Sequence, residues 1–349
     1  ALKMHDASGE CSYLALKAVI KFVNFHNKCG NVFREVGMLE VLIQRLICRG
    51  NDLKEQHGSV GGMAFSEPVP LPRLQPKKRV DSELDESQIV DDDEDFYYGD
   101  AHGTQAESTT ALAVDRSEHG HVLLMECLAL LLTENIENAE KFRGAGGARV
   151  LYSMVPIAQS RVHALRVVQQ LVLDASFHAR EDFSTLLELM QAAQPTHYSV
   201  KIDILKMCLR LFSLEPRTKG LFREVQGFVY VISSLVALSN PDQTDVGSGK
   251  AAPEDGLLPE LVQKIFETLT AALCDSPANK HAMMHDIRYD ILAESLQTSG
   301  LVGSTSSAQP TFHYLLTMAC EGFGKQLDFE SQSAVPLVVN PGVLKVAMT

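Results

Sequence analysis

The sequence predicts an all-α fold built from a repeated helical unit, and three observations point to it. Trp is absent from the 349 residues, and Pro occurs only 14 times. Apolar stripes recur at helical spacing, whereas β-branched residues do not alternate with polar ones over long stretches. A phrase of Phe-Arg, then Gly, then an apolar run occurs three times. Together these features favour helices that stack in series.

The repeated phrase is anchored on Phe33, Phe142 and Phe222. Each Phe is followed by Arg, by a Gly four or five residues on, and by an apolar helical run. The three copies read NVFREVGMLEVLIQRL (31–46), EKFRGAGGARVLYSMV (140–155) and GLFREVQGFVYVISSL (220–235).

The spacing of the anchors predicts armadillo or HEAT repeats. Phe142 and Phe222 lie 80 residues apart, which is twice the period of ~40 residues typical of those families. A missing unit should lie near position 182, where Phe183 is found, and a degenerate fifth copy fits at 279–283. We therefore expect Phe33, Phe142, Phe183 and Phe222 to occupy equivalent core positions.

Between these phrases the sequence predicts longer amphipathic helices at 118–134, 197–214 and 257–275, each with apolar residues on one or more helical faces. The expected unit is a long helix, a short helix with Phe-Arg, a Gly break and a third helix. The Gly is expected to permit the sharp turn that a Cβ would hinder.

Two polar segments interrupt the repeats and are expected to be disordered, because they cannot bury enough apolar surface. The predicted fold is thus an all-α, armadillo/HEAT-like helical repeat solenoid with two disordered insertions. The expected order is first armadillo-like helices (1–49), a disordered acidic insertion (50–117), armadillo-like repeats (118–239), a polar loop (240–256), a further armadillo-like repeat (257–325), and a linker with the start of a truncated helix (326–349).

The charge distribution argues against a nucleic-acid or membrane ligand. Ten acids and no Lys or Arg lie within 81–100, so the rest of the chain carries only −3 of the net −13. A nucleic-acid binder normally shows a basic face, and none is evident. Lys77, Lys78 and Arg79 form one basic cluster, directly beside that acidic run. We expect no direct membrane binding, because acids are repelled by anionic lipid.

The seven Cys residues form no CxxC pair, and their odd number favours reduced, buried thiols. We expect no catalytic residues, cofactor or metal. The stretch Gly247–Lys250 lacks the first Gly and the final hydroxyl of a phosphate-binding loop. Gly144–Arg149 lacks the last Gly of a dinucleotide fingerprint. His281 and His285 share one helical face, but no third ligand is near in sequence.

The stretch from Asn138 to Leu151, with Ala164-Leu165 and Gln170-Leu171 behind it, looks like an armadillo repeat. More narrowly, FRGAGGARVLYSMVP…ALRVVQQLVLD resembles the N-terminal armadillo-like region of BEACH-domain scaffolds, most closely the autophagy-linked FYVE type. That resemblance implies very large cytoplasmic proteins in which helical repeats precede BEACH, WD-repeat and phosphoinositide-binding FYVE domains. It also implies selective autophagy of protein aggregates, or endolysosomal traffic, with peripheral contact to autophagic or endosomal membranes made by those C-terminal modules.

The leading interpretation is a non-catalytic scaffold segment that binds proteins, of a kind the sequence does not identify, on a concave solenoid surface. Polar positions of the third helices would line that surface. They are Glu40, Gln44, Arg45, Arg149, Tyr152, Glu188, Tyr230, Ser233, Asp290 and Glu294. The alternative is an armadillo-type transport adaptor that binds peptide cargo, but its groove depends on Trp and Asn ladders, and Trp is absent.

Overall fold

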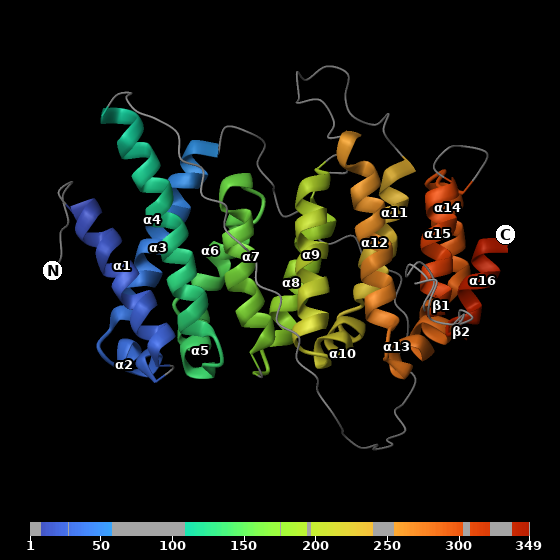
Figure 1. Ribbon diagram of the computed structural model, residues 1–349, viewed down its shortest axis with the longest axis horizontal. Coiled ribbons are helices and arrows are strands. Elements are labelled where there is room, and N and C mark those ends of the chain that lie inside the picture. Colours follow the sequence, from blue (N-terminus) through green and yellow to red (C-terminus); the bar gives the residue numbers. More distant parts are fainter. Residues whose placement is uncertain are drawn as a thin grey trace, which may run out of the picture.

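The computed structural model describes residues 8–26, 28–57, 109–174, 176–193, 197–239, 255–302, 308–321 and 337–348. These residues form helices stacked in series along one long axis (Figure 1), with one short pair of strands near the C-terminal end. The prediction of an all-α solenoid is confirmed.

The described helices group into units whose order follows the chain, four of them with three helices and one, the third along the chain, with two. The units are α1 (Ser8–Phe25), α2 (Cys29–Glu35) and α3 (Met38–His57); α4 (Thr109–Leu132), α5 (Ile136–Gly144) and α6 (Gly147–Met154); α7 (Ala158–Leu173) and α8 (Ala179–Ala192); α9 (Tyr198–Leu214), α10 (Arg217–Glu224) and α11 (Gly227–Val236); α12 (Leu258–Leu273), α13 (Pro277–Ala282) and α14 (Tyr289–Thr298).

The remaining elements are short or follow the fifth unit. They are the 3-10 turns Ala237–Ser239 and Asp255–Leu257, the π-helical segment Met283–Ile287, α15 (Ala308–Ala319), the antiparallel strands β1 (Cys320–Glu321) and β2 (Leu337–Val338), and α16 (Pro341–Met348).

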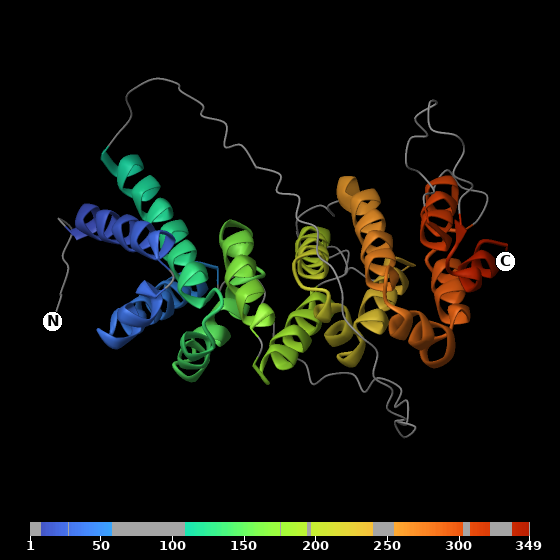
Figure 2. The same ribbon diagram turned by 60° about the horizontal axis from the view of Figure 1, so that its bottom comes forward.

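Helices that hold the same position in successive units pack next to each other. The long first helices α1, α4, α7, α9, α12 and α15 pack side by side in one row, and α3, α6, α8, α11 and α14 form a second row. The short helices α2, α5, α10 and α13 lie along one edge, at the bottom of Figure 1 and visible from another side in Figure 2. We call the exposed side of the second row the third-helix face.

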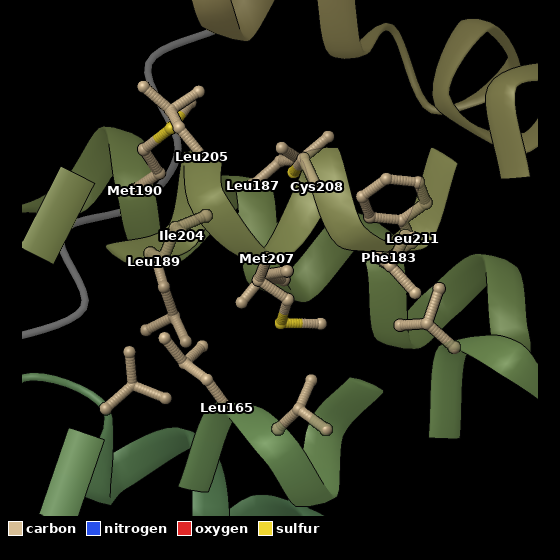
Figure 3. Close-up of a cluster of buried hydrophobic side chains, with 14 of the residues drawn as sticks. Leu165, Phe183, Leu187, Leu189, Met190, Ile204, Leu205, Met207, Cys208 and Leu211 are labelled. Atoms are coloured by element: carbon tan, nitrogen blue, oxygen red, sulfur yellow. The ribbon is translucent and has the colours of Figure 1, made fainter. Parts of the chain in front are cut away.

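The core runs continuously between the two rows. Figure 3 shows part of it, where Leu165 of α7, Phe183 and Leu187 of α8, and Ile204 and Leu211 of α9 gather. All of these side chains are buried. Since each unit packs on its neighbours, the core needs no central point, as expected for a solenoid.

The predicted equivalence of the four Phe residues is only partly correct. Phe142 and Phe222 are fully buried in short helices, and Phe33 is half-buried in α2. Phe183 is also fully buried, but it lies in α8, a third helix. The unit of α7 and α8 has no short helix, which the spacing alone does not reveal.

The degenerate fifth copy is confirmed, with Met283 in the place of Phe. Met283 follows Asn279 by four residues, as Phe142 follows Asn138. Met283 is fully buried at the end of the fifth unit's short helix. A flexible thioether therefore fills the site that an aromatic ring fills elsewhere.

The turn between short and third helices contains a residue in the left-handed region. In the first two units this residue is Gly37 (φ 77°) and Gly146 (φ 81°), as predicted. In the fourth unit the turn residue is Gln226 (φ 60°), so there Gly227 is not what permits the turn.

Gly147 and Gly227 begin their third helices and have a different role. A Cβ on Gly147 would lie 2.6 Å from the ring of Phe142, and a Cβ on Gly227 would lie 2.3 Å from the ring of Phe222. Glycine is required because the Phe ring lies directly on the backbone of the third helix.

The predicted insertion boundaries need correction. α3 continues to His57, with Leu53 in the core at 3% exposure, and α4 already begins at Thr109. Leu53 continues the apolar stripe of α3 into the predicted 50–117 insertion. Its remainder, 58–108, lies outside the described residues, as do 240–254 of the predicted polar loop.

The helix expected at the end of the predicted 326–349 segment is present as α16. α16 packs against α14 and α15 and buries Val343 and Val346. The β1–β2 pair was not predicted, because two-residue strands leave no periodic signal. Residues 322–336 lie outside the described part of the chain.

The two kinds of glycine give a matched test. Gly147→Ala and Gly227→Ala should each lower the free energy of unfolding by about 1–3 kcal/mol, because the added Cβ overpacks a Phe ring. Gly144→Ala and Gly220→Ala meet nothing within 4 Å, so they should be neutral or stabilising by up to about 1 kcal/mol. Chemical denaturation measures both pairs, and equal effects would contradict the ring contact.

Candidate functional site

The Arg after each anchoring Phe connects its unit to the next one. Arg34 Nη1 donates to Asn138 Oδ1 at 3.0 Å, and Arg223 Nη1 donates to Asn279 Oδ1 at 3.1 Å. Arg34 also donates to Asn135 Oδ1 at 3.3 Å, the side chain that caps α5. The Phe-Arg phrase therefore combines an intra-unit core residue with an inter-unit hydrogen bond.

The two acceptor amides sit in matching positions and are fully buried. Asn138 Nδ2 donates to the Leu131 carbonyl at 2.6 Å, and Asn279 Nδ2 donates to the Ala272 carbonyl at 2.8 Å. Each carbonyl lies seven residues earlier, near the end of a first helix. The amides thus satisfy carbonyls that helix ends leave without intrahelical partners.

Arg143 meets carboxylates instead, because the next unit has no short helix. Its Nε donates to Asp182 Oδ2 and its Nη1 to Asp174 Oδ2, both at 2.8 Å. A further bond runs from Nη2 to the Leu171 carbonyl at 2.9 Å. The side chains of Asp174 and Asp182 are only 2% and 8% exposed, so this is a largely buried ionic cluster.

Tyr152 completes that cluster. Its phenol donates to Asp182. Burial, followed by the negative charge of Asp182, raises the pKa of Tyr152. Burial alone would lower the pKa of Arg143, but its bonds and charge contacts with Asp174 and Asp182 raise it. The guanidinium and phenol both stay protonated at neutral pH.

Several of the predicted binding residues are exposed on the third-helix face. They are Gln44 on α3, Arg149 on α6, Glu188 on α8, and Asp290 and Glu294 on α14. Asp290 pairs with Arg288, and Glu188 accepts a bond from Ser184 Oγ at 3.1 Å. These positions, spread over four helices, are available to a partner.

The other predicted residues have partners within the solenoid. Arg45 bonds Ser12, and Glu40 pairs with Lys141, whose hydrogen bond lowers the pKa of Glu40. Tyr152 belongs to the Arg143 cluster, and Tyr230 is only 8% exposed. Ser233 donates to the Tyr230 carbonyl at 2.9 Å. The structure thus gives these side chains partners or burial within the solenoid that the sequence pattern does not show.

A shallow groove of about 430 Å³ crosses the third-helix face between α8 and the start of α11. Phe177, which lines it, is 84% exposed. Phe177 lies between α7 and α8, where other units have a short helix. The lining residues are Phe177, Arg180, Glu181, Ser184, Glu224, Val225, Gln226 and Tyr230.

The charges around this groove are mainly negative. Glu181 and Glu224 line it, against the one guanidinium of Arg180 among the lining residues. Glu188 lies close enough that its charge, after burial, raises the pKa of Tyr230. The structure thereby brings together the predicted residues Glu188 and Tyr230. The sequence missed Phe177, although an aromatic residue in an expected inter-helix turn is a detectable signal.

Within the described residues, no group of three or more His, Cys, Asp or Glu side chains could hold a metal ion. The rings of His281 and His285 lie 4.4 Å apart, centroid to centroid, on an exposed surface. Gly144–Arg149 is explained by the repeat, since Gly146 makes the turn and Gly147 contacts Phe142. The phosphate-loop-like stretch, 247–250, lies outside the described residues.

The cysteines divide into two classes. Cys127 and Cys208 are buried in first helices, and burial raises the pKa of each thiol to about 12. Cys48 and Cys274 are exposed, and Cys29 and Cys320 are intermediate. The expectation of buried thiols therefore holds for two of the six whose side chains are described. No helix in the described ranges is both long and apolar enough to span a bilayer.

Comparison with known proteins agrees with this architecture. A family model described as armadillo-like repeats matches residues 181–333. BEACH domain-containing protein A2 of Arabidopsis thaliana is 22% identical over 314 residues, covering 84% of this chain and 8% of that protein. Protein SPIRRIG of the same organism is 21% identical over 318 residues, covering 86% and 8%. No solved structure matches.

The chain is an all-α helical repeat solenoid in which residues 181–333 match armadillo-like repeats, and it has distant similarity to BEACH domain-containing protein A2. It spans less than a tenth of the length of the relatives it matches.

The ionic cluster predicts a large, local stability effect. Arg143→Met leaves Asp174 and Asp182 buried without their cation, so the free energy of unfolding should fall by about 3–5 kcal/mol. Arg149→Met, at an exposed position on the adjacent α6, should change it by less than about 0.5 kcal/mol. Denaturant titration distinguishes the two, and a small loss for Arg143→Met would show that the cluster does not couple the units.

A buried imidazole predicts the pH dependence of stability. Burial, then the charges of Arg49 and His163, lowers the pKa of His121 from 6.5 to about 4. Neither ring nitrogen has a hydrogen-bond partner among the described residues. Below pH 6.5 His121 therefore binds a proton in the unfolded chain, whereas in the folded chain it binds a proton only near pH 4. His121 contributes stability above pH 6.5 that is lost as pH falls through that window.

We expect His121→Leu to reduce the fall in Tm between pH 7 and pH 4.5 relative to the unmodified chain. The matched substitution His285→Leu, at an exposed position, should leave that fall unchanged. If the fall in Tm between pH 7 and pH 4.5 is the same for all three proteins, protonation of His121 does not cause it.

Proposed function

We propose that this chain is a non-catalytic protein-interaction segment of a large cytoplasmic scaffold, and that partners bind on its third-helix face. The groove with Phe177 carries the proposal. It combines a highly exposed aromatic side chain with polar groups from two adjacent units, and aromatic residues are over-represented among interface anchors. Arg149, Asp290 and Glu294 extend the same face to either side.

The groove suits an extended or helical peptide that supplies an apolar side chain and basic groups. Phe177 offers apolar contact area, while Glu181, Glu188 and Glu224 place carboxylates around it. Electrostatic complementarity of this kind mainly sets specificity and association rate. Arg180 adds a cation that would favour one peptide orientation over the other.

For the cellular role, we propose selective autophagy or endolysosomal trafficking. Two observations support it: the matched relatives include a protein named for its BEACH domain, and the FRGAGGARVLYSMVP stretch resembles the autophagy-linked FYVE type. In that setting this segment would select protein partners, and membrane contact would come from modules outside it. The whole protein would be peripheral on autophagic or endosomal membranes.

The alternative, a transport adaptor that binds peptide cargo, has less support. Such a groove uses Trp and Asn ladders on third helices, and the sequence contains no Trp. Asn138 and Asn279 are the asparagines at repeated positions, but they lie in short helices. Both are fully buried and committed to inter-unit hydrogen bonds.

The groove can be tested by partner capture with matched variants. Phe177→Ser removes the apolar anchor and leaves the charge of the groove unchanged, so capture of a groove partner should fall at least about tenfold, as for a hot spot worth about 1.4 kcal/mol or more. Val162→Ser changes another exposed apolar residue, at 58%, on α7. It should leave capture unchanged in quantitative mass spectrometry of immobilised chain.

Equal recovery with both variants would place the partner elsewhere on the molecule. Loss with both would indicate non-specific apolar adsorption. Either result would remove the groove from the proposed function.

A further inference from the structure

The first helix carries a second apolar stripe that none of the described residues covers. Leu14, Ala18, Phe22 and Phe25 follow helical spacing and are exposed, with Leu14 and Phe22 at 59% and Phe25 at 87%. Another face of α1 carries Leu16 and Val19, which are buried, and α1 packs against α4. α1 is therefore apolar on two sides, although it lies at the end of the row (Figure 1, Figure 2).

The exposed stripe occupies positions that are buried in the next unit. Counted back from the anchoring Phe, Ala18 and Phe22 correspond to Cys127 and Leu131 of α4. Those residues are 0% and 1% exposed. The first helix of the preceding unit, α1, packs along α4.

The fourth unit repeats this pattern. The corresponding residues before Phe222 are Met207 and Leu211 of α9, which are 4% and 0% exposed. There the preceding first helix is α7, which packs along α9. The stripe on α1 thus has the same positions as a unit-to-unit interface, without the unit that would complete it.

The third helix of the first unit also exposes an apolar residue whose counterpart in the next unit is buried. Val41 is 53% exposed, whereas its counterpart Val150 in α6 is 8% exposed. Val150 is covered by α3, since a Cβ on Gly50 would lie 2.5 Å from its Cγ1. The thiol of Cys48 is exposed one turn from Gln44 on the same helix.

We propose that this end of the solenoid docks a further armadillo-like helical unit, supplied by polypeptide that precedes Ala1 in the full protein. The inference rests on the proposed function, in which this chain is one segment of a longer scaffold. Two parallel lines, on α1 and on α3, match the two helix rows along which neighbouring units pack. A single peptide bound in one groove would cover only one of these two lines.

The charges around the face are of both signs. The line on α3 runs beside Glu40 and Asp52 and beside Arg45 and Arg49. Lys17 and Lys21 flank the α1 stripe. An apolar centre with a charged and polar rim is the usual anatomy of a protein interface.

Two native thiols allow a direct test by alkylation and mass spectrometry. Cys48 lies on the docking face, and Cys274 is exposed at the distant end of α12 and serves as the reference. In the 349-residue chain both should react at similar rates. In a polypeptide of the same protein extended upstream, the Cys48-to-Cys274 ratio should fall at least about tenfold, because a docked unit closes the face.

A matched pair of variants identifies the cause. In the extended polypeptide, Phe22→Asp should restore Cys48 reactivity, while Val162→Asp should not, although both residues are on first helices and are 59% and 58% exposed. In the 349-residue chain neither substitution should change Tm, which controls for misfolding.

Other results would overturn the inference. An unchanged ratio in the extended polypeptide would show that no unit docks there. Protection that grows with the concentration of the 349-residue chain would assign the face to a second copy. Protection by phosphatidylserine-containing vesicles would assign it to lipid. The Phe177→Ser variant should not affect the ratio, so a failure of the groove proposal can be told apart from a failure of the docking proposal.

Discussion

The structure depends on a Phe ring laid directly on the backbone of the following helix. Phe222 makes edge-on contacts with Phe212 of α9 and Phe228 of α11, with centroids 5.2 and 5.0 Å away, and it reaches Phe183 of the preceding unit at 6.0 Å. One side chain thereby joins all three helices of its unit to the unit before. Gly227 makes this approach possible, because any Cβ there would overlap the ring.

The Arg beside each Phe extends that contact forward along the chain. In units with a short helix it meets a neutral buried amide, and in the unit without one Arg143 meets two carboxylates. A carboxylate pair can replace the amide because a buried guanidinium needs compensating charge or hydrogen bonds. Where the short helix is missing, the Arg of the preceding unit still reaches the next unit, but it bonds carboxylates there and not an amide.

Stacking in one dimension also decides which surface is left for partners. Side chains between neighbouring third helices, such as Tyr152 and Tyr230, become part of the contact between units. The remaining face consists of exposed polar residues and the groove at α8, where the shortened unit leaves Phe177 in the turn before that helix. If partners bind as proposed, most of the residues that would recognise them differ from those that join the units.

The sequence by itself determined the helical class, the position of most helices and the Phe-Arg phrase, because helical periodicity and the anchor spacing are local properties. It could not show that Phe183 belongs to a third helix, since counting residues does not detect a missing helix. It could not show that Gln226 makes a left-handed turn or that Arg143 meets Asp174 and Asp182, because these depend on neighbouring units. Likewise, only stacking decided that Tyr230 is buried while Phe177 is exposed. The exposure of a side chain follows from which helix lies against it, and that neighbour is fixed only when the units pack.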